Sequence, residues 1–320
     1  MKKQLIIFMM AVLVMLTGCQ GNTQDVTEPQ EPSAKSNKSQ TEETQENMHL
    51  SIGLMPAVDT APILLADEKG YFTDLGLDVT IDIYTNAQDR QTALQTNSID
   101  GAMTDLVAVA TNVNGGFDIK ATTITDGMFP ILASPESIDK TSISVGMMEV
   151  SVSNFLVDEW LGSDYEIEKV FINPIPGRLE AVATRQVDMG LFPEPVATIG
   201  ESKGLTKLVF EPKDGNFPDV MVFTGQAISN KPQAIEAFHK AYNKAVLDIQ
   251  EDQMLARDVL VKRIPNIKEG VKDLMLLPEY EKARTPDIEY IQKIIDWANM
   301  ELNLDLSVEA SDLIDGSFIE

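Results

Sequence analysis

The stretch SIGLMPAVDTAPILLADEKGY, residues 51–71, decides the fold. It opens with a short apolar run of the kind that forms buried strands. Asp59 and Thr60 are helix N-cap types, Pro62 suits a first helical turn, and Gly70 suits a helix end. The stretch therefore predicts a strand, a loop and a helix, in that order.

The same order of signals returns later in the chain. The run SVGMM at 144–148 and the stretch that follows it, up to Leu161, repeat the pattern of residues 51–71 at a shift of 93 (51 to 144). ALQTNSID at 93–100 likewise resembles AVATRQVD at 181–188, at a shift of 88 (93 to 181). Two blocks in the same order at nearly the same shift predict two α/β lobes of one design. Chance similarity is the alternative, because βα units look alike.

The chain begins with a targeting segment. Two lysines precede an apolar run of 12 residues from Leu5 to Leu16, which is too short to span a bilayer. Residues 1–18 are therefore predicted to be a signal peptide. The ending Leu-Thr-Gly-Cys resembles the lipobox of bacterial lipoproteins, which implies cleavage before Cys19 and attachment of diacylglycerol to its thiol. An ordinary secretory signal is the alternative.

Residues 19–47 are predicted to form a disordered tether. After Cys19 they are almost entirely Gln, Thr, Glu, Ser, Pro, Lys and Asn, a composition that cannot bury enough apolar surface to order itself. Cys19 is also the only cysteine, so a disulfide within the chain is excluded.

The charge excludes some partners. The full chain has 25 basic and 50 acidic side chains, and loss of Lys2 and Lys3 with the signal leaves 23 − 50 = −27. Nucleic acid and anionic lipid headgroups are poor partners for such a surface.

Residues 48–320 are predicted to fold as two lobes whose strands alternate with helices, a pattern that favours parallel sheets covered on both sides. Residues 48–131 plus 222–320 are assigned to lobe 1 and 132–221 to lobe 2, so two crossings make a hinge. Predicted lobe 1 strands after residues 51–55 are 78–84, 99–103, 119–124 and 220–227, and predicted lobe 2 strands are 143–148, 169–173, 187–192 and 207–210. Predicted helices at the C-terminal end start at Lys231 and cover 255–264, 287–302 and 308–314.

Ligands of open parallel sheets bind outside the carboxyl ends of the strands, where helix N-termini point. This rule selects hydrogen-bonding residues in the loops of both lobes: Pro56, Asp59, Thr60, Asn86, Gln88, Thr104, Asp105, Glu149, Ser151, Ser153, Asn173, Arg178, Phe192 and Glu194. An alternative role for Asp59, Thr60, Ser151 and Ser153 is helix capping alone. Asp89 and Arg90 are expected to be solvated first-turn residues. The aromatic residues available to stack a ring are Phe129 and Phe192 first, along with Tyr84 and Phe117.

The residues of common catalytic sites are missing. The two histidines, His49 and His239, have no cysteine, second histidine or Gly-x-Ser-x-Gly turn near them in sequence. The chain also lacks the Gly-x-x-x-x-Gly-Lys loop that holds nucleotide phosphates. We therefore expect no catalytic residue, no metal and no cofactor.

The segments Gly70-Tyr-Phe and Ile99-Asp-Gly-Ala, followed by Phe192-Pro-Glu-Pro and Ile228-Ser-Asn-Lys-Pro, resemble the substrate-binding proteins of ABC importers. The resemblance is to the nitrate/sulfonate/taurine and thiamine-pyrimidine-precursor branch, called NMT1/THI5-like, and covers roughly residues 50–249. It implies a type II periplasmic-binding-protein fold, a monomer that is not an enzyme, and a solute held between two lobes. It also implies permease and ATPase partners and a lipid anchor on the outer face of the plasma membrane.

The loop residues favour one kind of solute. Asp59, Asp89, Asp105, Glu149 and Glu194 outnumber the two arginines in these loops. A neutral or amine-bearing molecule such as a pyrimidine precursor is therefore expected, rather than nitrate or sulfonate. Two alternatives stay open: an enzyme of the same fold that acts on a small carboxylate, and a surface sensor lipoprotein.

Overall fold

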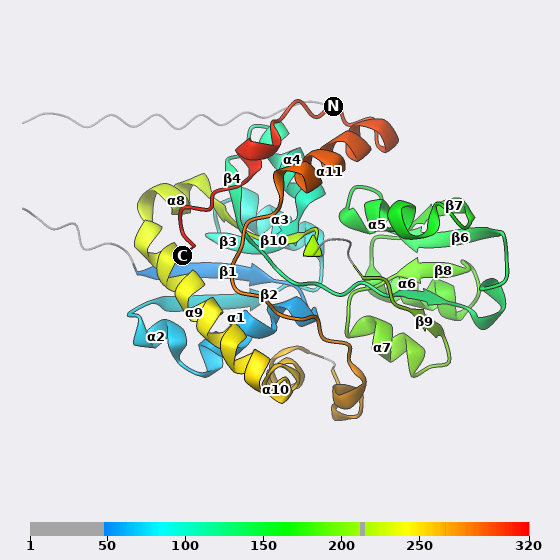
Figure 1. Ribbon diagram of the computed structural model, residues 1–320, viewed down its shortest axis with the longest axis horizontal. Helices are drawn as coiled ribbons and strands as arrows, with labels where there is room; N and C mark the ends of the chain where they lie inside the picture. Colours follow the sequence, from blue (N-terminus) through cyan, green and yellow to red (C-terminus); the bar gives the residue numbers. More distant parts are fainter. Residues whose placement is uncertain (1–47, 212–214, 266, 320) are drawn as a thin grey trace, which may run out of the picture. The chain divides into compact units, whose positions relative to one another are not determined.

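The computed structural model describes residues 48–211, 215–265 and 267–319, shown in Figure 1. The predicted signal peptide, the tether and Cys19 lie outside the described residues. Within the described ranges, no helix has the length and apolarity needed to cross a membrane.

Two mixed sheets organise the described chain. The first lobe is built on the sheet β2-β1-β3-β10-β4, whose strands are β1 (His49–Leu54), β2 (Asp78–Ile83), β3 (Gly101–Asp105), β4 (Ile119–Ile124) and β10 (Asp219–Thr224). The second lobe is built on β7-β6-β8-β5-β9, whose strands are β5 (Ile131–Ala133), β6 (Ser142–Met147), β7 (Glu166–Phe171), β8 (Met189–Leu191) and β9 (Thr206–Leu208). The two orders correspond strand for strand, which confirms two α/β lobes of one design.

The prediction of parallel sheets is only partly right. β1 pairs in parallel with β2 and β3, but β10 runs antiparallel to both β3 and β4, and β5 runs antiparallel to β8 and β9. Both exceptions are strands that arrive directly from the other sheet. Parallel pairing requires a crossover connection such as a helix, and these two strands have none. Each enters its sheet from the side of the other lobe, where the carboxyl ends of the parallel strands lie, so it pairs antiparallel to its neighbours.

The repeat extends to single hydrogen bonds. The Asp100 backbone N–H donates to the Ser51 carbonyl, and the Asp100 carboxylate accepts from the Ser51 N–H, both at 2.8 Å. Asp188 makes the same two bonds to Ser144, both at 3.0 Å. Asp100 and Asp188, the last residues of the similar segments 93–100 and 181–188, are therefore equivalent positions of the two lobes.

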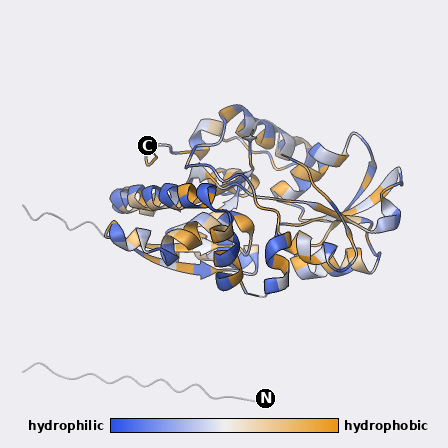
Figure 2. Cartoon of the chain, turned by 60° about the horizontal axis from the view of Figure 1, so that its bottom comes forward, coloured by the Kyte–Doolittle hydropathy of each residue, from blue (hydrophilic) through white to orange (hydrophobic). Residues whose placement is uncertain are grey.

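Helices cover the sheets. Their bounds are α1 (Ala61–Glu68), α2 (Tyr71–Asp74), α3 (Ala87–Gln95), α4 (Leu106–Asn114), α5 (Val152–Leu161), α6 (Ile175–Ala183), α7 (Val196–Glu201), α8 (Gly225–Asn230), α9 (Pro232–Glu251), α10 (Met254–Arg263) and α11 (Ile288–Glu301). In α9 the buried Ile235, Phe238 and Tyr242 recur at three and four residues, so one face packs on the first sheet. Figure 2 shows the resulting mixture of hydrophilic and hydrophobic residues along the helices.

Two predicted elements end differently. The strand predicted at 220–227 stops at Thr224, because the Thr224 hydroxyl accepts from the Ala227 N–H and caps α8. The helix predicted at 308–314 is a short 3-10 turn, Ala310–Leu313, followed by a bridge from Ile314 to β4.

The C-terminal helix α11 contacts both lobes. It packs on α4 of the first lobe and on α5 of the second. The Trp297 ring lies edge-on to Phe155 of α5 at 5.5 Å, and its indole N–H donates to Asp158 at 2.9 Å. The lobes are thus held together at this side by aromatic packing as well as by the chain crossings.

Candidate functional site

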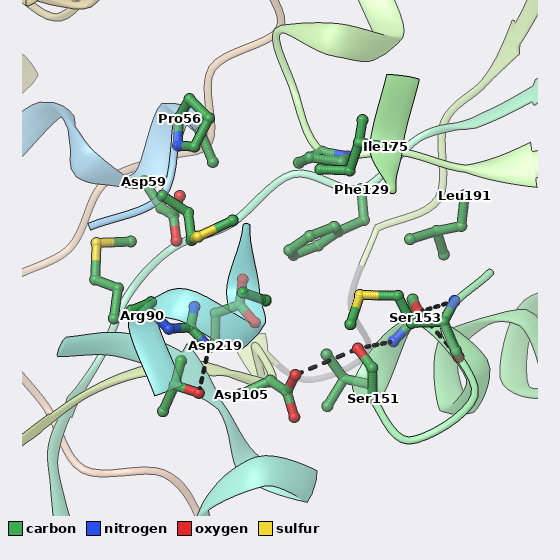
Figure 3. Close-up of a pocket in the computed structure, with 18 of the residues that line it drawn as sticks. Pro56, Asp59, Arg90, Asp105, Phe129, Ser151, Ser153, Ile175, Leu191 and Asp219 are labelled. Carbon is green, nitrogen blue, oxygen red and sulfur yellow. Dashed lines mark hydrogen bonds between the residues drawn. The ribbon is translucent and has the colours of Figure 1, made fainter. Parts of the chain in front are cut away.

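A cavity of about 120 Å³ lies where the loops of the two sheets meet (Figure 3). At some 10–15 Å³ per water, this volume holds roughly ten small non-hydrogen groups. The cavity is lined by residues of both lobes: Met55, Pro56, Ala57, Asp59, Ala87, Arg90, Met103, Thr104, Asp105, Phe129, Met148, Ser151, Val152, Ser153, Ile175, Arg178, Leu191, Pro193 and Asp219.

Two buried arginines occupy equivalent positions on the two walls. Arg90 lies on α3 and Arg178 on α6, at the same shift of 88 (90 to 178) as the repeat. Each stem crosses a glycine of the neighbouring strand: a Cβ on Gly53 would stand 3.4 Å from Cγ of Arg90, and one on Gly146 would stand 3.1 Å from Cγ of Arg178. A Cβ at Gly146 would therefore crowd the Arg178 stem, whereas the distance from Gly53 to the Arg90 stem is an ordinary van der Waals contact.

The first-lobe wall carries three carboxylates, Asp59, Asp105 and Asp219. Asp59 is 2% exposed; its Oδ2 accepts from the Thr125 hydroxyl at 3.0 Å, while its Oδ1 has no hydrogen-bond partner among the described residues. Arg90 lies beside these acids, but its one side-chain hydrogen bond in the described chain goes from Nη2 to the Thr104 hydroxyl, at 2.9 Å. The charges on this wall are close but not directly paired.

Burial changes the protonation of these acids. It raises the pKa of Asp59 to about 6, with a smaller contribution from the nearby Asp126, while the Thr125 hydrogen bond opposes the shift. Burial, together with the charges of Asp59 and Asp105, raises the pKa of Asp219 well above its usual range. Like charges in one dry site cannot all ionise freely. The wall is therefore a site that favours added positive charge.

A hydrogen bond joins the two lobes at the cavity. The Ser151 hydroxyl caps α5 by accepting from the Ser153 N–H at 3.2 Å, and it donates to Oδ2 of Asp105 at 3.3 Å. Asp105 in turn caps α4, since its Oδ1 accepts from the Ala108 N–H at 2.9 Å. Capping and cavity lining are therefore not exclusive roles for these residues (Figure 3).

The second-lobe wall carries positive charge. Arg178 is 2% exposed, its Nη1 donates to the Ile172 carbonyl at 2.9 Å, and its guanidinium lies 5.3 Å from the Phe192 ring centre. Burial lowers the pKa of Arg178 to about 10. Nε of Arg178 has no hydrogen-bond partner in the described ranges, and no described carboxylate forms an ion pair with this side chain.

The rest of the lining is apolar and adaptable. Met55, Met103 and Met148 line it together with the Phe129 ring. Methionine is unbranched and polarisable, which suits an irregular organic surface. Phe129 contributes a ring to the lining, whereas Phe192 is fully buried against Arg178 and does not line the cavity.

The structure divides the predicted site residues. It places in the cavity wall Pro56, Asp59, Thr104, Asp105, Ser151, Ser153 and Arg178. It places outside the wall Thr60, Asn86, Gln88, Glu149, Asn173, Phe192 and Glu194.

Each residue outside the wall has a local reason. Thr60 is buried and donates to the Ala57 carbonyl at 2.7 Å. Asn86 caps α3 by accepting from the Gln88 N–H at 2.8 Å, and both side chains are exposed. The side chains of Glu149 and Asn173 are exposed as well.

Glu194 contacts the other lobe through its backbone only. Its carboxylate is fully buried and pairs with Lys207 at 3.1 Å inside the second lobe. Its carbonyl accepts from the Val58 N–H of the first lobe at 3.1 Å. The carboxylate is therefore directed away from the cavity.

Two charged residues of the cavity lining are not among the predicted site residues. Arg90 was expected to be solvated but is 7% exposed and lines the cavity, and its position 88 residues before Arg178 was the available signal. Asp219 begins β10, an antiparallel strand, so its amino end reaches the cavity. The rule that ligands bind at the carboxyl ends of parallel strands does not select a residue at the amino end of an antiparallel strand.

This chain is similar in sequence to one protein family and in fold to several solved structures. The sequence profile described as NMT1/THI5 like matches residues 57–256. Among solved structures, a ligand-binding component of an ABC-type import system from Staphylococcus aureus, with zinc bound, has a TM-score of 0.70 at 16% identity, covering 84% of this chain and 97% of that one. The alkanesulfonate-binding protein SsuA of Xanthomonas axonopodis pv. citri, bound to MOPS, has a TM-score of 0.68 at 15% identity, covering 84% and 99%.

A third structure agrees in fold. The periplasmic nitrate-binding protein NrtA of Synechocystis PCC 6803 has a TM-score of 0.66 at 12% identity, covering 85% of this chain and 87% of that one. No curated protein sequence matches this chain. Within the described ranges, no group of three or more His, Cys, Asp or Glu side chains is placed to hold a metal ion.

Proposed function

Because the chain belongs to the NMT1/THI5-like family, we propose that it is the extracytoplasmic solute-binding subunit of an ABC importer. It captures a small polar organic molecule between its two lobes and delivers it to a membrane permease powered by an ATPase. The observation that carries this proposal is the cavity whose walls come from both lobes. A solute there would be covered when the lobes close about the two crossings, from β4 to β5 and from β9 to β10.

The proposed solute is neutral or amine-bearing, in the manner of a pyrimidine precursor, rather than nitrate or sulfonate. Three aspartates and two arginines line the cavity, so acids are in excess, and most of the remaining lining is apolar. The aspartates would repel an inorganic anion. Such an anion also has no apolar surface to bury against the apolar part of the lining.

The location of the protein is part of the proposal. Lipid attached to Cys19 would hold the folded part on the outer face of the plasma membrane, with residues 20–47 as the tether. The protein would act as a monomer and without catalysis. Turnover of a bound metabolite, followed by mass spectrometry, would instead support the enzyme alternative.

A thermal-shift screen tests the function. Pyrimidines, amines, sulfonates, nitrate and small carboxylates are added singly to the purified protein, and one chemical class is expected to raise the melting temperature. A ligand at 100 times its Kd stabilises by about 2.7 kcal/mol, which is readily measured. The absence of any stabilisation across the panel would contradict the proposal.

A further inference from the structure

We infer, on the premise of the proposed function, that the captured solute carries a protonated amine or amidinium, which binds between Asp59 and Asp219, and an acceptor group that binds Arg178. The solute is thus bipolar, with its positive end in the first lobe. The inference stands on unpartnered buried atoms, on charge and on the size of the cavity.

The first observation is the free oxygen of Asp59. Its Oδ1 is buried without a hydrogen-bond partner in the described part of the chain, although the residue lines the cavity. Leaving a buried charged acceptor unsatisfied costs free energy that a donor from a bound molecule would recover. A solute N–H at this position supplies that donor.

The second observation is the excess of acid on the same wall. Asp219 lines the cavity and, within residues 48–211, 215–265 and 267–319, forms no side-chain hydrogen bond and no ion pair. Arg90 lies near Asp59, Asp105 and Asp219 and attracts all three, but one guanidinium cannot neutralise three carboxylates. A second cation completes the charge balance of this wall.

The donor requirement also excludes one kind of cation. A quaternary ammonium has no N–H and is usually held in a cage of aromatic rings. Phe129 is the one aromatic ring of the described lining, so no such cage exists there. The positive group of the solute therefore carries hydrogen atoms that it can donate.

The opposite wall selects the other end of the solute. Arg178 is the lobe 2 equivalent of Arg90, but no aspartate of the lining accompanies it on its own lobe. Nε is buried without a hydrogen-bond partner in the described chain in both Arg178 and Arg90. Because Arg178 alone has no lining carboxylate on its own lobe, its donor is open to an acceptor of the solute, either a carboxylate or a carbonyl. A cavity of about 120 Å³ limits the solute to roughly ten non-hydrogen atoms, and this limit also keeps its two ends close together.

Binding of the cation is coupled to proton release. The titratable and charged groups around Asp59 and Asp219 are Arg90 from α3, Asp105 from β3, Asp126 after β4, Tyr242 from α9, Tyr280 from the C-terminal segment and Tyr290 from α11. The pKa of Asp59 is about 6 and that of Asp219 is raised, so protonation of the pair competes with binding of the cation. The cation binds the fully ionised pair, and the displaced proton goes to solvent. Affinity is therefore expected to fall as the pH drops through about 6.

The test is calorimetric titration of the full-length protein in detergent. The probes are ω-amino carboxylates of three to six carbons, the same molecules with a trimethylated nitrogen, and the matching plain amines and plain carboxylates. At least one ω-amino carboxylate is expected to bind, with trimethylation weakening it at least about tenfold. Titrations in buffers of different ionisation enthalpy are expected to show proton release at pH 6, the pKa of Asp59.

Variants locate the cation. Asp219→Asn is expected to weaken binding at least about tenfold, as the strength of a charge-assisted hydrogen bond implies. Asp89→Asn removes the same charge from an exposed position on the same lobe and is expected to change nothing. If circular dichroism shows that Asp219→Asn does not fold, Asp59→Asn provides the same comparison.

The contrary outcomes are separable. Binding of nitrate, a sulfonate or a plain carboxylate with no ω-amino carboxylate bound would overturn the bipolar solute but leave the proposed function intact. Equal weakening by Asp89→Asn would overturn the assignment to the Asp59–Asp219 pair. Silence of every probe here and of the thermal-shift panel would overturn both.

Discussion

Asp59 shows how a buried carboxylate in the cavity wall lowers the stability of the fold that carries it. It is almost completely buried, and its pKa of about 6 lies above its ordinary value of 3.8. Because the pKa of Asp59 is higher in the folded state than in the unfolded state, its protonated form contributes about 3 kcal/mol to the free energy of unfolding below pH 4. This contribution is lost as the pH rises through 6. The amide of Asp59→Asn keeps an acceptor for Thr125 and has no charge to bury. We therefore expect this variant to be up to about 3 kcal/mol more stable than the wild type at pH 8.

Urea unfolding at pH 8 and pH 4 measures this difference, with Asp89→Asn as the exposed control. The advantage of Asp59→Asn should vanish at pH 4, where the wild-type acid is already protonated. An equal stability gain at both pH values would show that the charge of Asp59 is not its cause.

His239 has the opposite dependence on pH. It is buried in α9 between the Ile235 carbonyl at 2.8 Å and the Thr122 hydroxyl at 3.0 Å, and burial lowers its pKa to about 4. A depressed histidine pKa stabilises the fold above pH 6.5, and this contribution of about 3 kcal/mol is lost as the pH falls to 4.

His239→Gln, which cannot titrate, is therefore expected to be less stable than the wild type at pH 7.5 and to lose less stability on acidification to pH 4.5. Chemical denaturation at both values measures the slope. An unchanged slope would exclude His239 as the acid-sensitive group.

At the scale of elements, Asp188 fixes the turn that enters β8. Although burial alone would raise its pKa, hydrogen bonds from Lys140, Ser144 and Ser137 lower it to about 2. Its ionised form therefore stabilises the second lobe above pH 4, and that contribution is lost between pH 4 and 2. Because Lys140 is half exposed, solvent screens part of the interaction.

Asp188→Asn is expected to cost about 1–2 kcal/mol at pH 7 and little at pH 2.5. Thermal unfolding at the two pH values measures the loss, with Asp164→Asn, an exposed residue before β7, as the control. A loss that is equal at both pH values would assign the effect to packing instead of charge.

The elements also show what sequence can predict and where it fails. Period and turn signals located most helices and strands, and the Ser51–Asp100 and Ser144–Asp188 bonds account for the similarity of residues 93–100 and 181–188. Asp219 was missed because strand direction depends on pairing between distant segments, which no local pattern encodes.

Arg90 was missed for a different reason. Its burial depends on contacts with distant segments, among them the hydrogen bond to Thr104 of β3. Glu194 was assigned to the cavity for the converse reason, because its partner Lys207 lies in a later strand. Loop membership could be predicted, but side-chain direction could not.

For the whole molecule, the proposed mechanism requires the lobes to separate. The Ser151–Asp105 hydrogen bond and the Val58–Glu194 backbone bond cross between them beside the cavity, while α11 packs on α5 at another side. A hydrogen bond contributes about 1 kcal/mol and the packed aromatic pair contributes more. Opening should therefore begin at Ser151, with the α11 side as the pivot.

Fluorescence transfer can follow this motion. Asn86 and Asn173 are exposed on opposite lobes, so cysteines at both, in a Cys19→Ser background, accept a dye pair without touching the cavity. Transfer is expected to rise when the solute binds. Ser151→Ala removes the hydrogen bond across the cavity and a helix cap worth about 1 kcal/mol, so it should lower the transfer of the ligand-free protein while saturating solute restores it. Ser163→Ala, exposed after α5, is the control. Identical transfer in every state would mean that the lobes do not move, and capture by closure would then be wrong.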